Sequence, residues 1–343
     1  MISFPEVLKS LISGKSLSAA ESEFVLNEIM DGKASSVLTA AFLTALAQKG
    51  ETHEEIVGMA RAMRSHVLKV RGGADIMDTC GTGGSGKNRF NVSTITAFIL
   101  SSQGVRIAKH GNRASSRGNG SFDLLEKLGI NITLSPVQVE QCLAQEDIAF
   151  LFAPLFHPAM KYVVPIRKEL GIRTVFNILG PLCNPAGAAY QLLGTISLSL
   201  AEKLSHALSI LQTQRAIVVA GSNGLDEATT LGPFSYYELN AGKTQLKEID
   251  PGTLGFKTPS EKEIEGGDVA ENEKIFYLIL EDHAESAKKD MVLLNAGLGF
   301  TVAGKTKNFS DGITLARKAI DQGSAFQKFK QYKKLSLQMS NNG

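Results

Sequence analysis

The chain has 343 residues, of which 43% are hydrophobic and 20% charged, so it is too apolar to be disordered and long enough for two cores. Its net charge of +2 argues against general attraction to nucleic acid or to an anionic membrane. Cys80, Cys142 and Cys183 lie far apart and lack zinc-site spacing. With no secretory signal and no long apolar stretch, we expect a cytoplasmic protein with reduced thiols and neither a nucleic-acid nor a membrane partner.

Residues 1–70 are predicted to form a small domain of four helices. The apolar residues between Phe4 and Ile12 recur at helical spacing. Ser18 and Thr52 each begin an S/T-x-x-E capping box, which is typical of a helix start. No alternating strand pattern interrupts this segment.

From residue 76 onward, short apolar strands alternate with helices, which is typical of a mostly parallel sheet flanked by helices. We expect strands at 76–80, 105–109, 148–153, 190–197 and 215–220, with a strand pair near 234–248. We expect helices at 93–103, 122–128, 136–145, 158–170, 199–211, 273–284, 286–298 and 311–336. The sequence therefore predicts an α/β domain over 71–343, with part of 158–185 packing on the helical domain.

Residues 78–94, DTCGTGGSGKNRFNVST, are predicted to run from a strand through a glycine-rich loop into a helix. The four closely spaced glycines allow several backbone N–H groups to point at one anion. Ser93 and Thr94 then open a helix whose positive end favours negative charge. This pattern indicates a phosphate site, and the alternative is a tight turn without a ligand.

The same segment nearly matches a nucleotide-binding P-loop. Gly81, Gly86 and Lys87 satisfy G-x-x-x-x-G-K, but Asn88 stands where Ser or Thr would hold Mg²⁺. A kinase or NTPase is therefore the weaker interpretation.

Residues 105–121, VRIAKHGNRASSRGNGS, are predicted to form another strand and polar loop. Lys109, Arg113 and Arg117 offer three cations to phosphate oxygens. Neutral hydrogen-bonding groups accompany them at Asn112, Ser115, Ser116 and Ser121. Two such loops after consecutive strands favour one phosphate-rich ligand over a solvated basic loop.

Two further segments complete the predicted site. Apolar walls with one fixed guanidinium suit a flat aromatic acid, and Arg167 follows apolar residues and His157. Arg167 could equally lie on a helix surface, and an isolated His157 is more often structural. Asp226 and Glu227, in the loop AGSNGLDEATTLGP, offer two oxygen ligands suited to Mg²⁺.

Taken in order, these motifs resemble the anthranilate phosphoribosyltransferase family over about residues 1–335. The motifs are GTGG with N-x-S-T, KHGNR, FLFAP with HPAMK, R-T-x-F-N-x-L-G-P-L-x-N-P and G-L-D-E. The resemblance implies a helical and an α/β domain, an architecture that nucleoside phosphorylases share. It also implies a homodimer formed through the helical domain and the second step of tryptophan biosynthesis.

The resemblance implies a role for particular residues. Phosphoribosyl diphosphate would be bound by Gly81, Gly84, Asn91, Ser93, Thr94, Lys109 and Ser121, to which we add Ser85, Arg89, Arg113 and Arg117. Anthranilate would lie near Gly81, His110, Asn112, His157 and Arg167. Mg²⁺ would be held by Ser93, Asp226 and Glu227, and Lys109 would join both carboxylates in catalysis.

The chain also departs from the family pattern. Ser85 stands where the family usually has Asp, and Arg89 stands where it has a small polar residue. Lys87 adds a cation between them, and Arg117 lies one place before the usual basic residue. The glycine-rich loop therefore gains positive charge.

Two rival functions stay open from the sequence. A nucleoside phosphorylase would attack ribose with phosphate and would not need Asp226. A nucleic-acid-binding relative without catalysis would bind DNA in a salt-dependent way. In the preferred reaction the amine of anthranilate displaces diphosphate, so stabilising the leaving group matters most and no acid–base role is assigned to His110 or His157.

Overall fold

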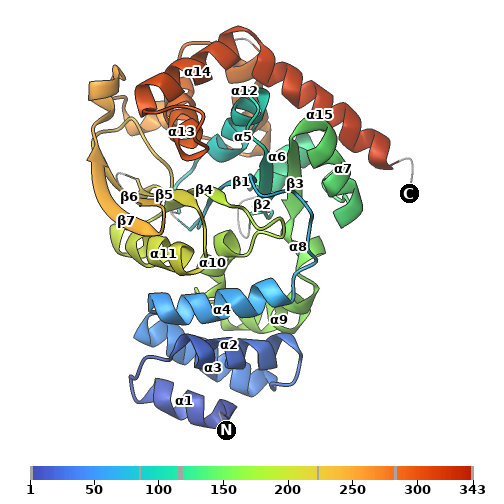
Figure 1. Cartoon of the computed structure of the whole chain (residues 1–343), viewed down its shortest axis with the longest axis vertical. Helices are drawn as coiled ribbons and strands as arrows, with labels where there is room; N and C mark the ends of the chain where they lie inside the picture. Colours follow the sequence, from blue (N-terminus) through green and yellow to red (C-terminus); the bar gives the residue numbers. More distant parts are fainter. Residues whose placement is uncertain (1–2, 85, 115–118, 222–223, 282–283, 341–343) are drawn as a thin grey trace.

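The computed structural model describes residues 3–84, 86–114, 119–221, 224–281 and 284–340. Its N-terminal end is a helical layer below an α/β body (Figure 1). The helices are α1 (Phe4–Ile12), α2 (Ala19–Met30), α3 (Ser36–Lys49) and α4 (His53–Ser65). Both predicted capping boxes are present, because the side chains of Ser18 and Thr52 accept the backbone N–H three residues on.

The helical layer is closely packed. A Cβ atom at Gly58 of α4 would lie 2.1 Å from the backbone oxygen of Ala19, so glycine lets α4 lie directly on the start of α2. Two later elements, the 3₁₀ helix η1 (Pro158–Tyr162) and α9 (Val164–Leu170), pack against α2 and α3. Ala159 and Val163 are buried in the same core as the four helices.

Seven strands form one sheet in the order β3-β2-β1-β4-β5-β6-β7. The strands are β1 (Met77–Gly81), β2 (Ile107–Gly111), β3 (Ile148–Phe152), β4 (Tyr190–Thr195), β5 (Arg215–Ala220), β6 (Phe234–Asn240) and β7 (Lys243–Ile249). Neighbours among β1 to β5 are parallel, and β6 and β7 are antiparallel. The predicted fold class, a helical unit plus a mostly parallel sheet flanked by helices, is confirmed.

The other helices of the described residues surround the sheet, some of them packed on its strands and some on other helices. They are α5 (Val92–Ser102), α6 (Ser121–Lys127), α7 (Pro136–Glu146), α8 (Ala153–Phe156), α10 (Phe176–Leu179), η2 (Gly180–Leu182), α11 (Leu198–Ile210), η4 (Pro251–Leu254), η5 (Glu261–Ile264), α12 (Val269–Leu280), α13 (Ala287–Val302), α14 (Phe309–Asp321) and α15 (Ser324–Ser340).

Two segments that were each predicted as one continuous helix are divided into two helices in the structure. The segment 158–170 is divided into η1 and α9, because Pro165 lacks an N–H and fits only the first turn of a helix. The segment 311–336 is divided into α14 and α15 at Gly323, whose φ of +70° is left-handed.

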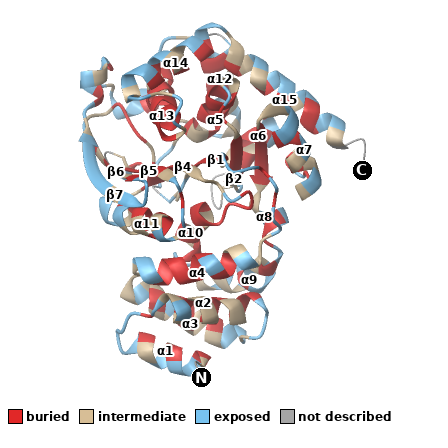
Figure 2. Cartoon of the chain, in the orientation of Figure 1, coloured by how far each residue is buried: buried red, intermediate tan, exposed pale blue. Residues whose placement is uncertain are grey.

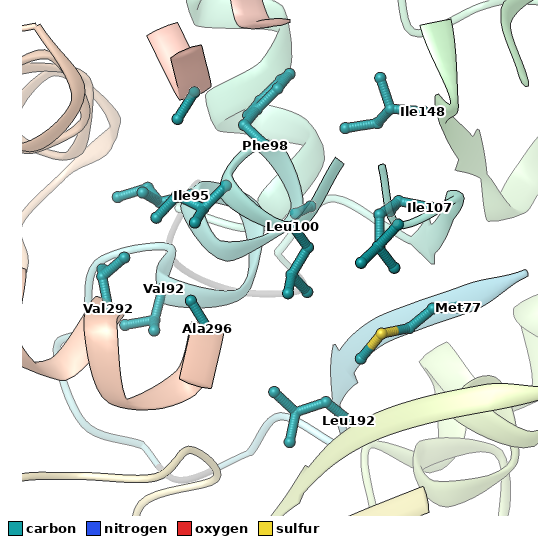
Figure 3. Close-up of a cluster of buried hydrophobic side chains, with 14 of the residues drawn as sticks. Met77, Val92, Ile95, Phe98, Leu100, Ile107, Ile148, Leu192, Val292 and Ala296 are labelled. Carbon is teal, nitrogen blue, oxygen red and sulfur yellow. The ribbon is translucent and has the colours of Figure 1, made fainter. Parts of the chain in front are cut away.

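Adjacent residues of β4 belong to different cores. Leu192 belongs to the same core as Met77, Phe98 and Val292, on the face covered by α5 and α13 (Figure 3). Leu193 points to the opposite face, into a core shared with α10, α11 and the N-terminal helices. Figure 2 shows α4 mostly buried, between the other N-terminal helices and the α/β body. The core of the helical layer therefore continues into one face of the sheet.

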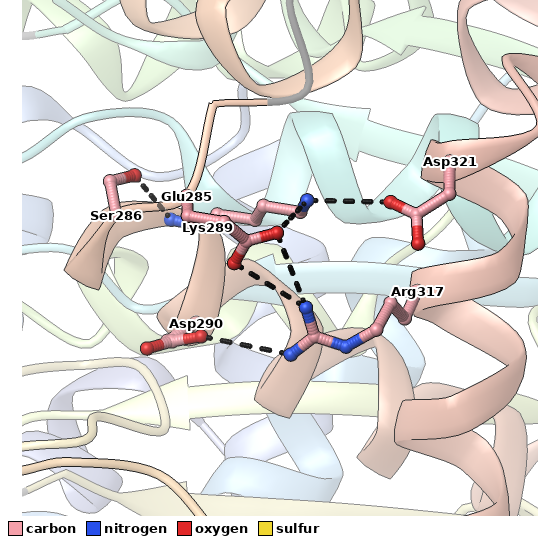
Figure 4. A network of polar contacts seen from close by, with 6 residues as sticks. All are labelled: Glu285, Ser286, Lys289, Asp290, Arg317 and Asp321. Atoms are coloured by element: carbon pink, nitrogen blue, oxygen red, sulfur yellow. Dashed lines mark hydrogen bonds and ion pairs between the residues drawn. The ribbon is translucent and has the colours of Figure 1, made fainter.

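A polar network fixes the last helices outside the sheet (Figure 4). Lys289 of α13 is only 1% exposed, and its Nζ lies 2.6 Å from Glu285 Oε1 and 3.4 Å from Asp321 Oδ1. Arg317 of α14 lies 3.4 Å from the same glutamate. Because a buried ammonium needs charged partners, these contacts hold α13 and α14 together.

The three cysteines are free thiols, and Cys142 and Cys183 are buried. Burial raises the pKa of Cys142 to about 11, so this thiol resists ionisation. Across the described ranges, no helix combines the length and apolarity needed to cross a membrane.

Candidate functional site

The strand order creates a crevice at the carboxyl ends of β1 and β4. The chain after β1 leads to β2 and β3 on one side, whereas the chain after β4 leads to β5 on the other. Ligands in open α/β sheets bind at such a switch point, because the loops diverge there. Gly81 and Gly194 are paired at this position and form its floor.

The two glycines make room for the acidic loop. A Cβ atom at Gly194 would lie 1.5 Å from the backbone oxygen of Asp226, and one at Gly81 would lie 2.9 Å from Asp226 Oδ2. A Cβ atom cannot lie as close to a backbone oxygen as it would at Gly194, so glycine at that position lets the acidic loop approach the end of β4, whereas at Gly81 the nearest atom belongs to the movable Asp226 carboxylate. This brings residues 226–227 to the predicted phosphate loop.

The three predicted metal ligands come together. Ser93, Asp226 and Glu227 line one cavity of about 10 Å³ between β1, β4 and α5. Glu227 is half-buried, but its Oε2 is buried and has no hydrogen-bond partner. Burial raises the Glu227 pKa to about 7, although Arg89 and Lys109 attract the ionised form.

This donor set fits Mg²⁺ better than a softer metal. In the described part of the chain, no group of three or more His, Cys, Asp or Glu side chains is arranged to hold a metal. Two adjacent carboxylates and a hydroxyl suit an ion that keeps waters and substrate phosphate oxygens in its shell. The partnerless Glu227 oxygen is the observation that favours a cation here.

Asp226 already has a cationic partner. Arg89 Nη1 forms an ion pair with Asp226 Oδ1, and only 15% and 11% of these two side chains are exposed. Desolvation lowers the pKa of Arg89, and the negative charge of Glu227 opposes that change. Arg89, which stays a predicted diphosphate-binding residue, pairs here with a predicted metal ligand.

The glycine-rich loop has the backbone conformation that its sequence predicts. Gly83, Gly84 and Gly86 have φ values of +65°, +82° and +67°, a region that side chains avoid. The Gly84 oxygen accepts a 3.1 Å hydrogen bond from Arg173 Nη1. Sequence reasoning missed Arg173, which connects the loop to the other half of the crevice. Ser85 lies outside the described residues.

Lys109 is buried in the middle of β2. Its Nζ donates to the Thr79 carbonyl and, at 3.0 Å, to Ser93 Oγ. Burial lowers the Lys109 pKa, and the charge of Asp78 opposes that effect. Asp78 in turn accepts a 2.8 Å bond from Asn184 Nδ2. The buried lysine therefore lies beside Ser93, next to the predicted metal ligands.

Amides join the two phosphate-loop segments. Asn91 Nδ2 donates to the Asn119 oxygen at 3.0 Å, and Asn272 Nδ2 donates to Asn91 Oδ1 at 3.2 Å. Ser121 Oγ donates to the Asn112 oxygen at 3.5 Å. Thr94 is buried, and its hydroxyl has no partner. Asn91 thus lies along the seam where the two loops meet, and Ser121 closes the second loop onto the residue that follows β2.

Arg113 points away from this seam. Its Nη2 lies 2.9 Å from Glu126 Oε1, and its guanidinium stacks 5.4 Å from the centre of the Phe152 ring. In this arrangement the contacts of Arg113 are with α6 and with the end of β3. The predicted residues Ser115, Ser116 and Arg117 lie outside the described residues.

The predicted aromatic half-site contains a buried histidine pair. The Nε2 atoms of His110 and His157 lie 3.1 Å apart, and both side chains are buried. Burial lowers the pKa of His110 to about 3 and that of His157 to about 4. Both rings are therefore neutral near pH 7, with one donating to the other.

Arg167 is half-buried and is not a fully solvated surface residue. Its Nη2 donates to Asn177 Oδ1 at 3.3 Å, and it lies 5.5 Å from the centre of the Phe176 ring. Its Nε is buried and has no partner, so a donor is left for a ligand. Asn112 is exposed at the end of β2.

A second cavity, of about 200 Å³, lies behind the glycine-rich loop. Its walls are Lys87, Arg89, Leu225 and Met291, with Glu261 of η5. Lys87 Nζ lies 3.3 Å from Glu261 Oε2, so this added cation faces η5. Sequence reasoning did not predict this cavity, because residues far apart along the chain form it.

Comparisons with known proteins agree with this architecture. Residues 5–67 match the helical bundle domain of the glycosyl transferase family, and residues 73–326 match its a/b domain. The chain is 43% identical to anthranilate phosphoribosyltransferase of Rubrobacter xylanophilus, over 98% of this chain and 99% of that protein. It is 44% identical to the enzyme of Chloroflexus aurantiacus, over 95% and 96%.

Solved structures show the same likeness. The enzyme of that name from Thermus thermophilus superposes with a TM-score of 0.90 at 39% identity, covering 96% of this chain and 99% of that one. The Saccharomyces cerevisiae enzyme in complex with PRPP and Mg also gives 0.90, at 28% identity and 98% coverage of both chains. The chain therefore belongs to the anthranilate phosphoribosyltransferase family.

Proposed function

We propose that this chain transfers the phosphoribosyl group of 5-phospho-α-D-ribose 1-diphosphate to the amine of anthranilate. The products are N-(5-phosphoribosyl)anthranilate and diphosphate, in the second step of tryptophan biosynthesis from chorismate. The observation that carries the proposal is the convergence of Ser93, Lys109, Asp226 and Glu227 at the β1–β4 crevice. The sequence likeness to enzymes of this name supports the same reaction.

Ser93, Asp226 and Glu227 would hold Mg²⁺ in this reaction. When bound, the ion supplies positive charge that polarises the diphosphate oxygens. The yeast relative crystallised in complex with PRPP and Mg supports this use of the metal. The partnerless Glu227 Oε2 is the oxygen that would gain most from the ion.

Lys109 and the backbone N–H groups of the glycine-rich loop would stabilise the leaving diphosphate. Such groups are held in place before the bond breaks, and removing one typically costs on the order of a hundredfold in rate. Lys109 is held between Thr79 and Ser93, so little reorganisation is needed as charge develops. Gly81, Gly84, Asn91, Thr94 and Ser121 would complete this binding surface.

Arg167 would hold the carboxylate of anthranilate, because its buried Nε has no partner within the protein. His110 and His157 would form a neutral wall of this pocket, with Asn112 and Gly81 nearby. An aromatic amine is already neutral near pH 7, so it needs positioning more than it needs a base. We therefore assign no proton transfer to the histidine pair.

The larger organisation is also part of the proposal. Residues 1–70, with part of 158–185, would act as one unit and residues 71–343 as the other. A homodimer through the helical unit is supported by exposed apolar side chains, with Val37 76% and Ile12 68% exposed. Light scattering tests this, since the mass of a single chain would exclude the dimer. The cytoplasm remains the predicted compartment.

The test of the reaction is loss of anthranilate fluorescence when the protein is mixed with phosphoribosyl diphosphate and Mg²⁺. The loss should require all four components, and the double variant Asp226→Ala, Glu227→Ala should abolish it. No loss from folded protein would contradict the proposal. Phosphorolysis of nucleosides would then favour a phosphorylase, and salt-dependent DNA binding would favour a nucleic-acid-binding relative.

A further inference from the structure

The main chain of Arg89 is held firmly in place. Asn272 Nδ2 donates to the Arg89 oxygen at 3.3 Å, and the Gly266 N–H donates to the Asn88 oxygen at 3.2 Å. A Cβ atom at Gly266 would lie 2.2 Å from the Arg89 carbonyl carbon, so the two backbones are in close contact. The direction in which the Arg89 side chain leaves the loop is therefore fixed by the fold.

That direction leads to Asp226. The ion pair between Arg89 Nη1 and Asp226 Oδ1 is mostly buried, so water and salt screen it only weakly. Glu227, the adjacent carboxylate, has an oxygen without a partner. The two predicted metal carboxylates thus differ, because Asp226 is in direct contact with Arg89, whereas Glu227 has an oxygen without a partner and interacts with Arg89 only through its charge.

We propose that Arg89 competes with the divalent cation for Asp226 in the substrate-free protein and moves to the diphosphate when substrate binds. A guanidinium in contact with Asp226 neutralises the carboxylate and repels a metal ion that approaches it. The incoming diphosphate offers a new partner, because a guanidinium matches phosphate oxygens with two parallel hydrogen bonds. This inference rests on the proposed function for the metal site and extends it to Arg89, a residue at which the chain departs from its family.

The competition predicts an order of binding. Metal alone would bind weakly, since it must first displace Arg89 from Asp226. Metal and diphosphate together would bind well, since Arg89 gains a partner as Asp226 is released. Removing the guanidinium should therefore strengthen metal binding to the free protein and weaken diphosphate binding.

The experiment measures Mn²⁺ binding to the substrate-free full chain by electron paramagnetic resonance. Arg89→Gln should bind Mn²⁺ about tenfold more tightly than the unmodified chain, because a neighbouring opposite charge changes carboxylate equilibria by that order. Lys87→Gln is the matched control: it removes a charge from the same loop, but Lys87 pairs with Glu261. Its Mn²⁺ affinity should stay within about twofold of the unmodified chain.

Variants that keep Arg89→Gln out of the comparison make the proposal testable if that variant folds poorly. Asp226→Asn alone should change Mn²⁺ affinity little, because the metal loses a ligand but no longer has to displace Arg89 from it, whereas Glu227→Gln should weaken Mn²⁺ binding strongly. Arg89→Lys keeps a charge but loses the planar fork, so it should bind Mn²⁺ more tightly than the unmodified chain. Inorganic diphosphate, measured by calorimetry with Mn²⁺ present, should bind Arg89→Lys more weakly than the unmodified chain.

Equal Mn²⁺ affinity of the unmodified chain and Arg89→Gln would overturn the proposal. So would an Asp226→Asn effect as large as that of Glu227→Gln in the unmodified chain. These results are independent of the fluorescence assay, so failure of the competition is distinguishable from failure of the proposed reaction.

Discussion

The floor of the crevice gives the sharpest prediction, through Gly194→Ala. The added Cβ would lie 1.5 Å from the Asp226 backbone oxygen, which must retreat by roughly 1.9 Å to regain an ordinary 3.4 Å contact. The acidic loop would move with it, and displacements of about 1 Å in an active site cost on the order of a hundredfold. We expect kcat to fall at least about a hundredfold, with a stability loss of about 1–3 kcal/mol from overpacking.

Steady-state anthranilate fluorescence and thermal melting measure the two effects separately. Gly242→Ala is the control, since its φ of +77° lies in the β6–β7 turn, where an added Cβ meets no atom within 4 Å. It should lose about 1 kcal/mol of stability through backbone strain and keep its kcat. Gly81→Ala should be milder than Gly194→Ala, because its tight contact, at 2.9 Å, is with the movable Asp226 carboxylate, and the Asp226 backbone oxygen lies at an ordinary 3.4 Å. A Gly194→Ala kcat within about threefold of normal would refute the reasoning.

Three further predictions concern the surroundings of the crevice. Arg167→Ala should raise the KM for anthranilate about tenfold or more and that for the diphosphate substrate little; equal effects would remove Arg167 from the pocket. Arg173→Ala should raise the KM of the diphosphate substrate several-fold by releasing the glycine-rich loop, and an unchanged KM would contradict this role. His110 and His157 have folded pKa values of about 3 and about 4, below the ordinary 6.5, so the stability present above pH 6.5 is lost as pH falls toward these values. Protonation of each histidine should lower the free energy of unfolding, measured with urea, by about 1.4 kcal/mol per pH unit in this range. His157→Asn should make this pH dependence shallower, whereas the exposed control His53→Gln should leave it unchanged.

Much of the fold could be predicted because local patterns determine it. The strands β1 and β5 lie within one residue of their predicted positions, since apolar runs bounded by polar or glycine residues mark buried parallel strands. The errors at 158–170 and 311–336 arise where periodicity continues across a residue that interrupts a helix. Pro165 and Gly323 mark these interruptions in the sequence, but the apolar spacing continues past both of them and predicts one long helix in each case.

The site was less predictable than the fold. A motif can be recognised from neighbouring residues, but the partner of each side chain depends on the tertiary structure. The glycine-rich loop and the acidic pair could be found from their motifs, yet the pairing of Arg89 with Asp226 spans 137 positions. Arg173 gave no signal of its own, since a single arginine in a loop is common. Arg113 was assigned to phosphate by its motif, and in the structure Glu126 and Phe152 hold it against α6.

The pairing of β1 with β4 also has a consequence for how the protein folds. Gly81 and Gly194 meet only after the chain that contains β2 and β3 has been made and folded, so this contact closes a very long loop. Non-local strand pairing slows folding, and until β4 docks, β1 has an unpaired edge open to wrong partners. During synthesis at about 5–20 residues per second, that edge waits several seconds for its partner. Recovery of sheet structure should therefore precede recovery of activity on refolding.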